Sequence, residues 1–291
     1  MEKTNNIFEI NIEKHLSRVL FRQNSKAQVL SKTENSVFIK TDSGKFITFC
    51  CGKNKEPNPQ TVVFSKKIPE FFNKNNSFYF DKIGLKSEKD RIDFRKNDFS
   101  QNHVSSIKWE RINKENVKKI KNWLVNKPFE GMTEIFCEEE SSFKIFLKPF
   151  LKDLKQAFYN GNNSAFFNIL TNMSGAGPGL TPATDDFICG ILIVLSILNN
   201  SNLLSKEWKV PKLRILRDTK GKTNHLSWNF IKISLSGFIS TWQYELLKDI
   251  ENDLKENILD NIDYGSTSGR DITTGIYFML QLVSERRSVN E

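Results

Sequence analysis

The chain has 291 residues, which is enough for one large domain or two smaller domains that each have a hydrophobic core. Hydrophobic residues make up 38% and charged residues 26% of the sequence, values that fit a globular protein and exclude a disordered one. The formal net charge is +9 at pH 7. The lysines are scattered, however, and form no dense basic run with aromatic residues, so we expect no nucleic-acid binding.

The cysteines and the apolar segments indicate a compartment. The four cysteines form no Cys-x-x-Cys pair, so neither a zinc site nor a thioredoxin-like motif is expected. The first residues lack the apolar region of a signal peptide. The longest uncharged apolar run, Phe187 to Leu198, is shorter than the ~20 residues that a membrane span needs. We therefore expect a cytoplasmic protein that does not contact a membrane.

The first part of the chain has the pattern of short strands. Its candidate strands are rich in β-branched and aromatic residues. They are RVLF at 18–21, SVFIK at 36–40, KFITFC at 45–50, TVVFS at 61–65 and SFYF at 77–80. TDSGK at 41–45 predicts a hairpin turn. We expect a small antiparallel β sheet or barrel in a β-rich N-terminal domain, residues 1–112, with no catalytic pattern of its own.

The remaining chain, residues 113–291, has helical periodicity and is expected to form a helical domain. Helices are predicted at 115–127, 141–161, 163–173, 182–199, 223–237, 241–262 and 269–284. Pro149 should kink or split the second of these helices. Residues 202–221 read as a connection. The predicted fold class is therefore α+β.

A glycine-rich loop precedes the most apolar helix, in the sequence SGAGPGLTPATDDF at 174–187. Gly175, Gly177 and Gly179 allow a positive φ and a close approach of the backbone to a ligand. Thr181 and Pro182 predict the N-cap and first residue of the helix. Because N–H groups are unpaired at a helix N-terminus, such a loop can hold an anion.

Two adjacent aspartates, Asp185 and Asp186, follow in the first turn of that helix. One reading is that they only offset the helix dipole. A single aspartate would be enough for that purpose, so we favour a functional role. The pair is a candidate ligand for Mg²⁺ that carries a phosphate. Alternatively, the carboxylates accept hydrogen bonds from the NH₂ group of an amide.

The same spacing occurs again near the C-terminus, in GSTSGRDITTG at 265–275. Gly179, Thr181 and Asp185 fit the pattern G-x-T-x₃-D, and so do Gly265, Thr267 and Asp271. A glycine follows each motif, at positions 190 and 275. We expect the two helix N-termini to face one cleft, with Arg270 as a fixed positive charge. The alternative is that both are merely well-capped helices.

The two loops together closely resemble the paired signatures of the AllH-like family, the family of oxamate carbamoyltransferase subunit AllH. The order of the chain is also similar, with a β-rich first part, a GLTP-type loop, a helix that begins near TNHLS and a TSG-type loop. The resemblance implies a bacterial enzyme subunit of allantoin and purine catabolism. Its reaction would move a carbamoyl group between carbamoyl phosphate and oxamate, with oxalurate as the carbamoylated form.

The resemblance also implies partners and site residues. The expected partners include a subunit similar to acyl-CoA synthetases, so this chain alone is expected to be inactive. The residues expected to bind a small anionic substrate lie in the two loops: Gly177, Gly179, Thr181, Thr267, Ser268 and Arg270. The residues expected to act in catalysis, or to hold a metal, are Asp185, Asp186 and Asp271. No cofactor other than Mg²⁺ is a candidate.

Two other classes of function stay open from the sequence. The chain could be a non-catalytic module that senses a small metabolite in a regulatory or scaffolding role. It could also bind a nucleotide through the glycine loop, although the loop lacks the lysine of G-x-x-x-x-G-K-[ST]. Ligand-dependent stabilisation distinguishes these classes.

Overall fold

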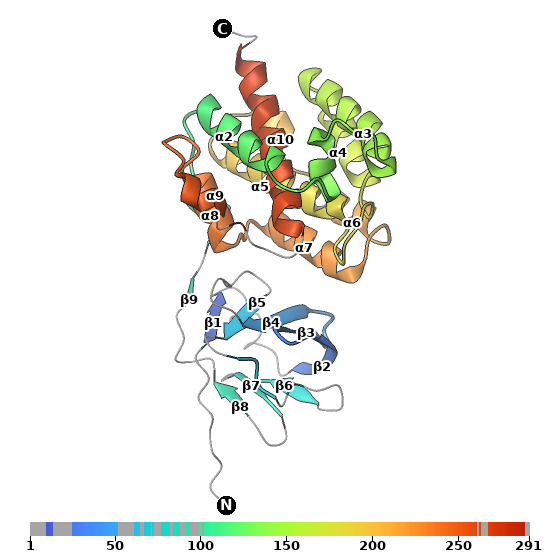
Figure 1. The fold of residues 1–291 in the computed structure, drawn as a ribbon, viewed down its shortest axis with the longest axis vertical. Coiled ribbons are helices and arrows are strands. Elements are labelled where there is room, and N and C mark those ends of the chain that lie inside the picture. The colour runs from blue at the N-terminus through green and yellow to red at the C-terminus, as the bar shows by residue number, and fades with distance from the viewer. Residues whose placement is uncertain are drawn as a thin grey trace, which may run out of the picture. The chain divides into compact units, whose positions relative to one another are not determined.

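The computed structural model describes residues 10–13, 25–51, 61–64, 67–70, 72, 77–81, 84–87, 91–93, 99–100, 102–260, 262 and 267–288. The chain folds as two compact units, Met1–Asn102 and His103–Glu291 (Figure 1). The first is β-rich and the second helical, so the predicted α+β class is confirmed.

The first unit is built around one sheet. Its strands are β1 (Ile10–Glu13), β2 (Ser25–Lys32), β3 (Ser36–Thr41), β4 (Phe46–Cys51), β5 (Thr61–Phe64), β6 (Phe78–Phe80), β7 (Gly84–Lys86), β8 (Arg91–Asp93) and β9 (Phe99–Ser100). They are arranged in the order β8-β7-β6-β2-β3-β4-β5-β1-β9. Most neighbours are antiparallel, but β4–β5 and β1–β9 are parallel, so the sheet is mixed.

Strands β3 to β6 lie where the sequence pattern predicts strands, whereas RVLF lies outside the described residues. The TDSGK turn is also present, with Gly44 at φ +78° and its N–H donated to the carbonyl of Thr41. Sequence reasoning missed β1, β2, β7, β8 and β9. In β2, SKAQVLSK, burial alternates from Ser25 to Leu30, but Val29 is the only β-branched residue, so the composition does not identify a strand.

The core of this unit is aromatic. Phe49, Phe64, Phe72 and Phe78 are buried, and their rings contact one another, with centroids 4.9 Å apart for Phe49 and Phe72. Because aromatic pairs at this separation add to the free energy of burial, these phenylalanines stabilise the sheet. The frequent use of Phe in this part of the sequence is thus structural.

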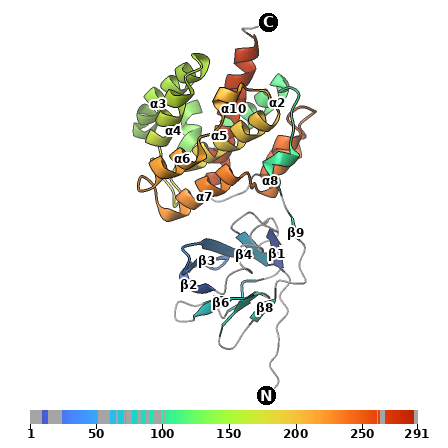
Figure 2. The same cartoon turned by 180° about the vertical axis from the view of Figure 1, so that it is seen from behind.

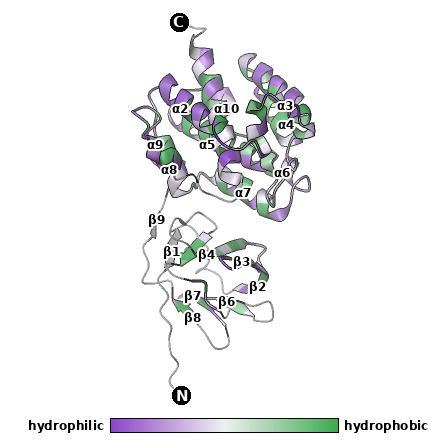
Figure 3. Cartoon of the chain, viewed as in Figure 1, coloured by the Kyte–Doolittle hydropathy of each residue, from purple (hydrophilic) through white to green (hydrophobic). Residues whose placement is uncertain are grey.

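The second unit consists of helices. They are η1 (Val104–Ser106), α2 (Lys114–Val125), η2 (Gly131–Phe136), α3 (Ser142–Tyr159), α4 (Asn163–Asn172), α5 (Ala183–Asn200), η3 (Lys206–Trp208), α6 (Lys212–Thr219), α7 (His225–Ser236), α8 (Thr241–Lys248), α9 (Glu256–Asp260) and α10 (Ser268–Ser288). The outer helices α2, α3 and α4 carry both hydrophilic and hydrophobic residues, as expected for amphipathic helices at a surface (Figure 3).

Three predictions for this unit need correction. Of the kink or split predicted at Pro149, the split is wrong, because α3 continues through this residue. Proline leaves the carbonyl of Ile145 without its helical partner, and Ile145 is exposed, so water can reach that carbonyl. The expected connection at 202–221 contains helix α6.

The third correction concerns residues 241–262, which form two helices, α8 and α9, rather than one. The buried amide of Asn116 on α2 explains the break, because it donates to the carbonyls of Asp249, Ile250 and Asn252 and accepts from the N–H of Leu254. These backbone groups are therefore not paired within a continuous helix.

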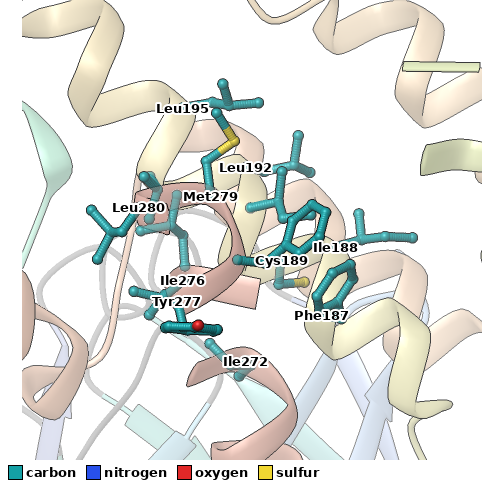
Figure 4. Close-up of a cluster of buried hydrophobic side chains, with 14 of the residues drawn as sticks. Phe187, Ile188, Cys189, Leu192, Leu195, Ile272, Ile276, Tyr277, Met279 and Leu280 are labelled. Carbon is teal, nitrogen blue, oxygen red and sulfur yellow. The ribbon is translucent and has the colours of Figure 1, made fainter. Parts of the chain in front are cut away.

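Helices α5 and α10 cross in the middle of the helical unit (Figures 1 and 2). The crossing is close because a Cβ at Gly190 would lie 2.1 Å from the carbonyl oxygen of Ile272, and a Cβ at Gly275 would lie 2.1 Å from that of Phe187. Apolar side chains from both helices fill the surrounding space (Figure 4). Helix α5 is apolar enough to span a membrane by length and composition, but 83% of that window is buried in the protein, as in a core helix.

Candidate functional site

The glycine-rich loop has the left-handed backbone that its sequence predicts. Gly175, Gly177 and Gly179 have φ values of +85°, +97° and +108°. Two of them are also required for packing, since a Cβ at Gly175 would lie 1.9 Å from the carbonyl oxygen of Lys222 and one at Gly177 would touch the Phe143 ring. Gly177 and Gly179 themselves are exposed, as is Leu180 at 69%. The loop therefore presents backbone at the surface, directly before α5.

Thr184 fixes the shape of this loop. Its hydroxyl donates to the carbonyl of Ala176 at 2.8 Å and accepts from the N–H of Ala176 at 3.0 Å. Helix α5 begins at Ala183, with Pro182 as its N-cap, one residue later than the sequence predicts.

Asp185 joins the loop to the start of α7. Its Oδ1 accepts from the Ser174 hydroxyl at 2.7 Å and from the Gly175 N–H at 2.9 Å. Its Oδ2 accepts from the Thr223 hydroxyl. The side chain of Asn224, which caps α7, donates to the carbonyl of Leu180 at 2.8 Å. The buried carboxylate of Asp185 is thus fully used inside the protein.

Asp186 faces the second loop instead. Its Oδ2 accepts from the Thr181 hydroxyl at 2.8 Å, and this hydroxyl lies 3.0 Å from the hydroxyl of Ser268. Ser268 is the first residue of α10. The glycine loop and the start of α10 therefore meet. Together with the Asp185–Thr223 contact, this places the N-termini of α5, α7 and α10 around residues 174–181.

Asp271 lies in the first turn of α10 and is completely buried. Its Oδ1 accepts from the backbone N–H of Met132 at 2.6 Å. Its Oδ2 is buried without a hydrogen-bond partner among the described residues. Gly131 precedes Met132 at φ +63°, and a Cβ there would lie 2.6 Å from Oδ1. The start of η2 therefore requires glycine to approach Asp271.

Two buried carboxyl groups, those of Asp186 and Asp271, have pKa values raised to near neutral pH. Burial raises the pKa of Asp186 to about 8, against the hydroxyls of Thr181 and Ser268, which favour the charged form. Asp271 and Asp185 raise this pKa further by repulsion. Burial raises the pKa of Asp271 to about 7, opposed by the N–H of Met132, the Thr267 hydroxyl and the positive charge of Arg270. Two such carboxyl groups can hold or release protons at physiological pH.

Arg270 contacts the segment before η2. Its guanidinium donates to the carbonyl of Pro128 at 2.9 Å and to the carboxylate of Glu130 at 3.2 Å, and its side chain is only 13% exposed. These bonds hold the turn that presents Gly131 and Met132 to Asp271. Thr267 precedes α10 and accepts the N–H of Asp271 at 2.9 Å through its carbonyl. Gly265, the first residue of the second motif, lies outside the described residues.

The crossing of α5 and α10 shows which residues of the two helices are equivalent, and this differs from the equivalence that the motif spacing indicates. Gly190 contacts the residue three positions before Gly275, and Gly275 contacts the residue three positions before Gly190, so the contact is reciprocal. In this register the counterpart of Asp271 is Asp186, not Asp185. The two aspartates in equivalent positions are also the two with near-neutral pKa values.

The residues described by the structure do not form a metal site of three or more His, Cys, Asp or Glu side chains. Asp185 and Asp186 are adjacent in sequence, but their oxygens bind different parts of the chain. The donor set gives no specific support to Mg²⁺ bound by this pair.

Sequence reasoning missed several residues that build the site. Gly131, Met132, Ser174 and Thr184 were not singled out, and Thr223 entered only as the first residue of the helix predicted at 223–237. Gly131 gives a weak local signal, as an isolated glycine before a helical pattern. The others act through ordinary hydroxyl or backbone groups, whose role depends on contacts far along the chain.

The fold and site define an α+β protein whose helical unit brings three helix N-termini together around a glycine-rich loop and buried carboxyl groups. Residues 173–280, which contain both loops, match the family model described as oxamate carbamoyltransferase subunit AllH. The resemblance to the AllH family is thus confirmed over this segment, just over a third of the chain. No curated protein and no solved structure matches the chain. The family description supports a carbamoyltransferase-related subunit and implies partner subunits.

Proposed function

We propose that this chain is a subunit of an oxamate carbamoyltransferase-like enzyme and binds a small anionic, amide-bearing metabolite where the starts of α5 and α10 meet. The observation that carries the proposal is the 3.0 Å contact between the hydroxyls of Thr181 and Ser268, which unites the two loops. Both loops lie in the segment that matches the AllH family model.

Electrostatics favours an anion at this place. Each helix N-terminus carries roughly half a positive charge and unpaired N–H groups. Three such ends, those of α5, α7 and α10, lie around the glycine loop. Gly177 and Gly179 supply exposed backbone next to them. A phosphate or carboxylate of the substrate would bind the N–H groups of this loop, next to the hydroxyls of Thr181 and Ser268.

The carboxyl groups suit the other end of such a metabolite. A carbamoyl or amide group presents NH₂ donors, and a carboxylate accepts from them. In this proposal Asp186 and Asp271 would accept these donors, and their pKa values near neutrality would let them take up or release a proton as the carbamoyl group moves. Asp185 would position the loop rather than touch substrate, and Arg270 would position the turn before Met132.

Positioning and electrostatic stabilisation would provide the catalytic effect in this proposal. The family description names a subunit, so the complete site would need a partner chain, with an acyl-CoA-synthetase-like protein as our candidate. The cytoplasmic location expected from the sequence belongs to the same proposal.

A thermal-shift series tests the proposal. Carbamoyl phosphate, oxamate, phosphate and ATP are added separately, since a ligand that binds only the folded state raises its apparent stability. We expect stabilisation by carbamoyl phosphate or oxamate. Ser268→Ala should reduce this shift by at least half, whereas Ser236→Ala, which removes an exposed hydroxyl bonded only to its own helix, should not change it.

Each other outcome argues against the proposal in a different way. Stabilisation by ATP alone would favour a nucleotide-binding module. If the ligand-induced shift in melting temperature is equal in Ser268→Ala and Ser236→Ala, the start of α10 is not part of the site. If none of the four compounds raises the melting temperature, even with the partner subunits present, the two loops only cap their helices and bind no ligand.

A further inference from the structure

A groove with a volume of about 330 Å³ lies between α2 and α10. We call it the α2–α10 groove. It shares no residue with the candidate site described above. Its lining residues come from both helices: Lys114, Val117, Lys118 and Lys121 from α2, and Tyr277, Ser284 and Glu285 from α10.

One wall of the groove is basic. Lys114, Lys118 and Lys121 are exposed and follow one another at helical spacing on the same face of α2. The neighbouring Lys119 pairs with Asp253, but no ion pair of Lys118 or Lys121 is found among the described residues. Lys114 and Lys118 also lie in the N-terminal half of α2, where the helix dipole adds to their positive potential.

The floor of the groove is apolar. Val117 and Tyr277 are each 6% exposed and pack at the contact of α2 with α10. On the opposite wall, the carboxylate of Glu285 already accepts hydrogen bonds from Tyr159 and from Gln281, the latter at 2.7 Å. The negative charge of Glu285 is therefore engaged within the protein, whereas Lys118 and Lys121 are exposed.

We propose that the α2–α10 groove docks an acidic segment of a partner protein. The carboxylates of that segment would pair with Lys118 and Lys121, and an apolar side chain between them would rest on Val117 and Tyr277. Charge complementarity selects this occupant. The three lysines span about 10 Å along the helix axis at ~1.5 Å per residue, which exceeds the reach of a single phosphate and matches a peptide with carboxylates one and two turns apart.

The proposal needs only that the chain has a partner, which the description of the matching family as a subunit supports. It stands or falls separately from ligand binding at the two loops. Because the groove and the loops share no residue, variants at one place leave the other intact.

The experiment uses the full chain and a fluorescein-labelled 14-residue peptide in which glutamates at helical spacing flank leucine. Fluorescence anisotropy measures its affinity at low and physiological salt. We expect the variant with Lys118→Glu and Lys121→Glu to bind at least tenfold more weakly. The matched control, Lys206→Glu with Lys209→Glu, changes the net charge equally at exposed residues and should stay within twofold of the parent.

Three outcomes would overturn the proposal. Equal weakening in both double variants would show attraction by net charge alone. Equal binding of a peptide with glutamine in place of glutamate would show that the lysines are not used. Binding of a 14-nucleotide single strand but not of the acidic peptide would assign the groove to nucleic acid. Unchanged unfolding midpoints of both variants are the check on folding.

Discussion

Asp185 and Asp186 are neighbours in the chain, yet their side chains do different work. Asp185 accepts three hydrogen bonds, from Ser174, Gly175 and Thr223, and so ties the glycine loop to α7. Asp186 accepts from Thr181 and faces the start of α10. At the residue scale, the adjacent pair therefore separates into one structural carboxylate and one candidate for chemistry.

This difference predicts opposite effects of the same substitution. Asp185→Asn replaces an acceptor oxygen by an NH₂ group and leaves buried donors unpaired, which should lower the free energy of unfolding by ~1–3 kcal/mol. Asp186→Asn should change it by less than about 1 kcal/mol, because an amide resembles the protonated acid and can still accept from Thr181. Urea unfolding at pH 7 measures both. A larger loss for Asp186→Asn would contradict the assignment.

The raised pKa values also predict the direction of a pH dependence. Carboxyl groups with a pKa of about 8 and about 7 in the folded protein have a pKa near ~4 when unfolded, so the folded state binds more protons between these values. Their contribution to stability is complete below pH ~4 and is lost as the pH rises toward 8, at up to about 1.4 kcal/mol per pH unit for each group.

The measurement is the free energy of unfolding from pH 5.5 to 8.5 for the parent and for Asp186→Asn with Asp271→Asn. The double variant should have the flatter profile. Asp185, Glu134, Arg270 and Cys189 are the other titratable or charged groups that interact with this pair, and they remain in both proteins. Identical slopes would show that the two carboxyl groups are ionised in the folded state.

At the scale of elements, the crossing of α5 and α10 depends on two glycines. Gly190→Ala and Gly275→Ala each place a Cβ atom 2.1 Å from a backbone carbonyl oxygen of the other helix, which is far inside van der Waals contact. We expect each to lower stability by about 3 kcal/mol or more, because the helices must separate. Gly221→Ala is the control, since it has the positive φ of +87° but open space around the new Cβ and should cost only ~1 kcal/mol. Similar losses in all three would mean that the crossing is not tight.

Some features of the helices and strands can be predicted from the sequence, and others cannot. The glycine loop, the buried character of α5 and the strands β3 to β6 follow from local patterns, namely glycine spacing, an apolar helix on all sides and short alternating runs. The break between α8 and α9 does not, because it depends on Asn116, which is more than a hundred residues away along the chain. Similarly, the repeated motif identified the two helices that meet, but only the crossing at Gly190 and Gly275 identifies Asp186 as the counterpart of Asp271.

At the scale of the whole molecule, the chain has two separate hydrophobic cores. One is formed by buried residues between Ala27 and Ile92, the other by buried residues between Val104 and Val283, and the two share no residue. All the residues of the candidate site and of the α2–α10 groove belong to the second unit. The function proposed above therefore needs the helical unit to keep its own fold.

We predict that a fragment of residues 103–291 folds independently, because its core is complete without the first unit. Circular dichroism should show a helical spectrum and one cooperative thermal transition. The full chain is the control for the helical signal. A fragment with a gradual transition and exposed apolar surface would show that the β-rich unit is required for the helical fold.

In the proposed function, the glycine loop and the start of α10 form a single binding site. Isothermal titration calorimetry with carbamoyl phosphate or oxamate, on the parent, Thr181→Val, Ser268→Ala and the double variant, tests it most directly. We expect weaker binding in each single variant and a double variant that loses less than the sum of both, because the two hydroxyls contact each other and, in the proposal, the same ligand. An unchanged affinity in both single variants would contradict it.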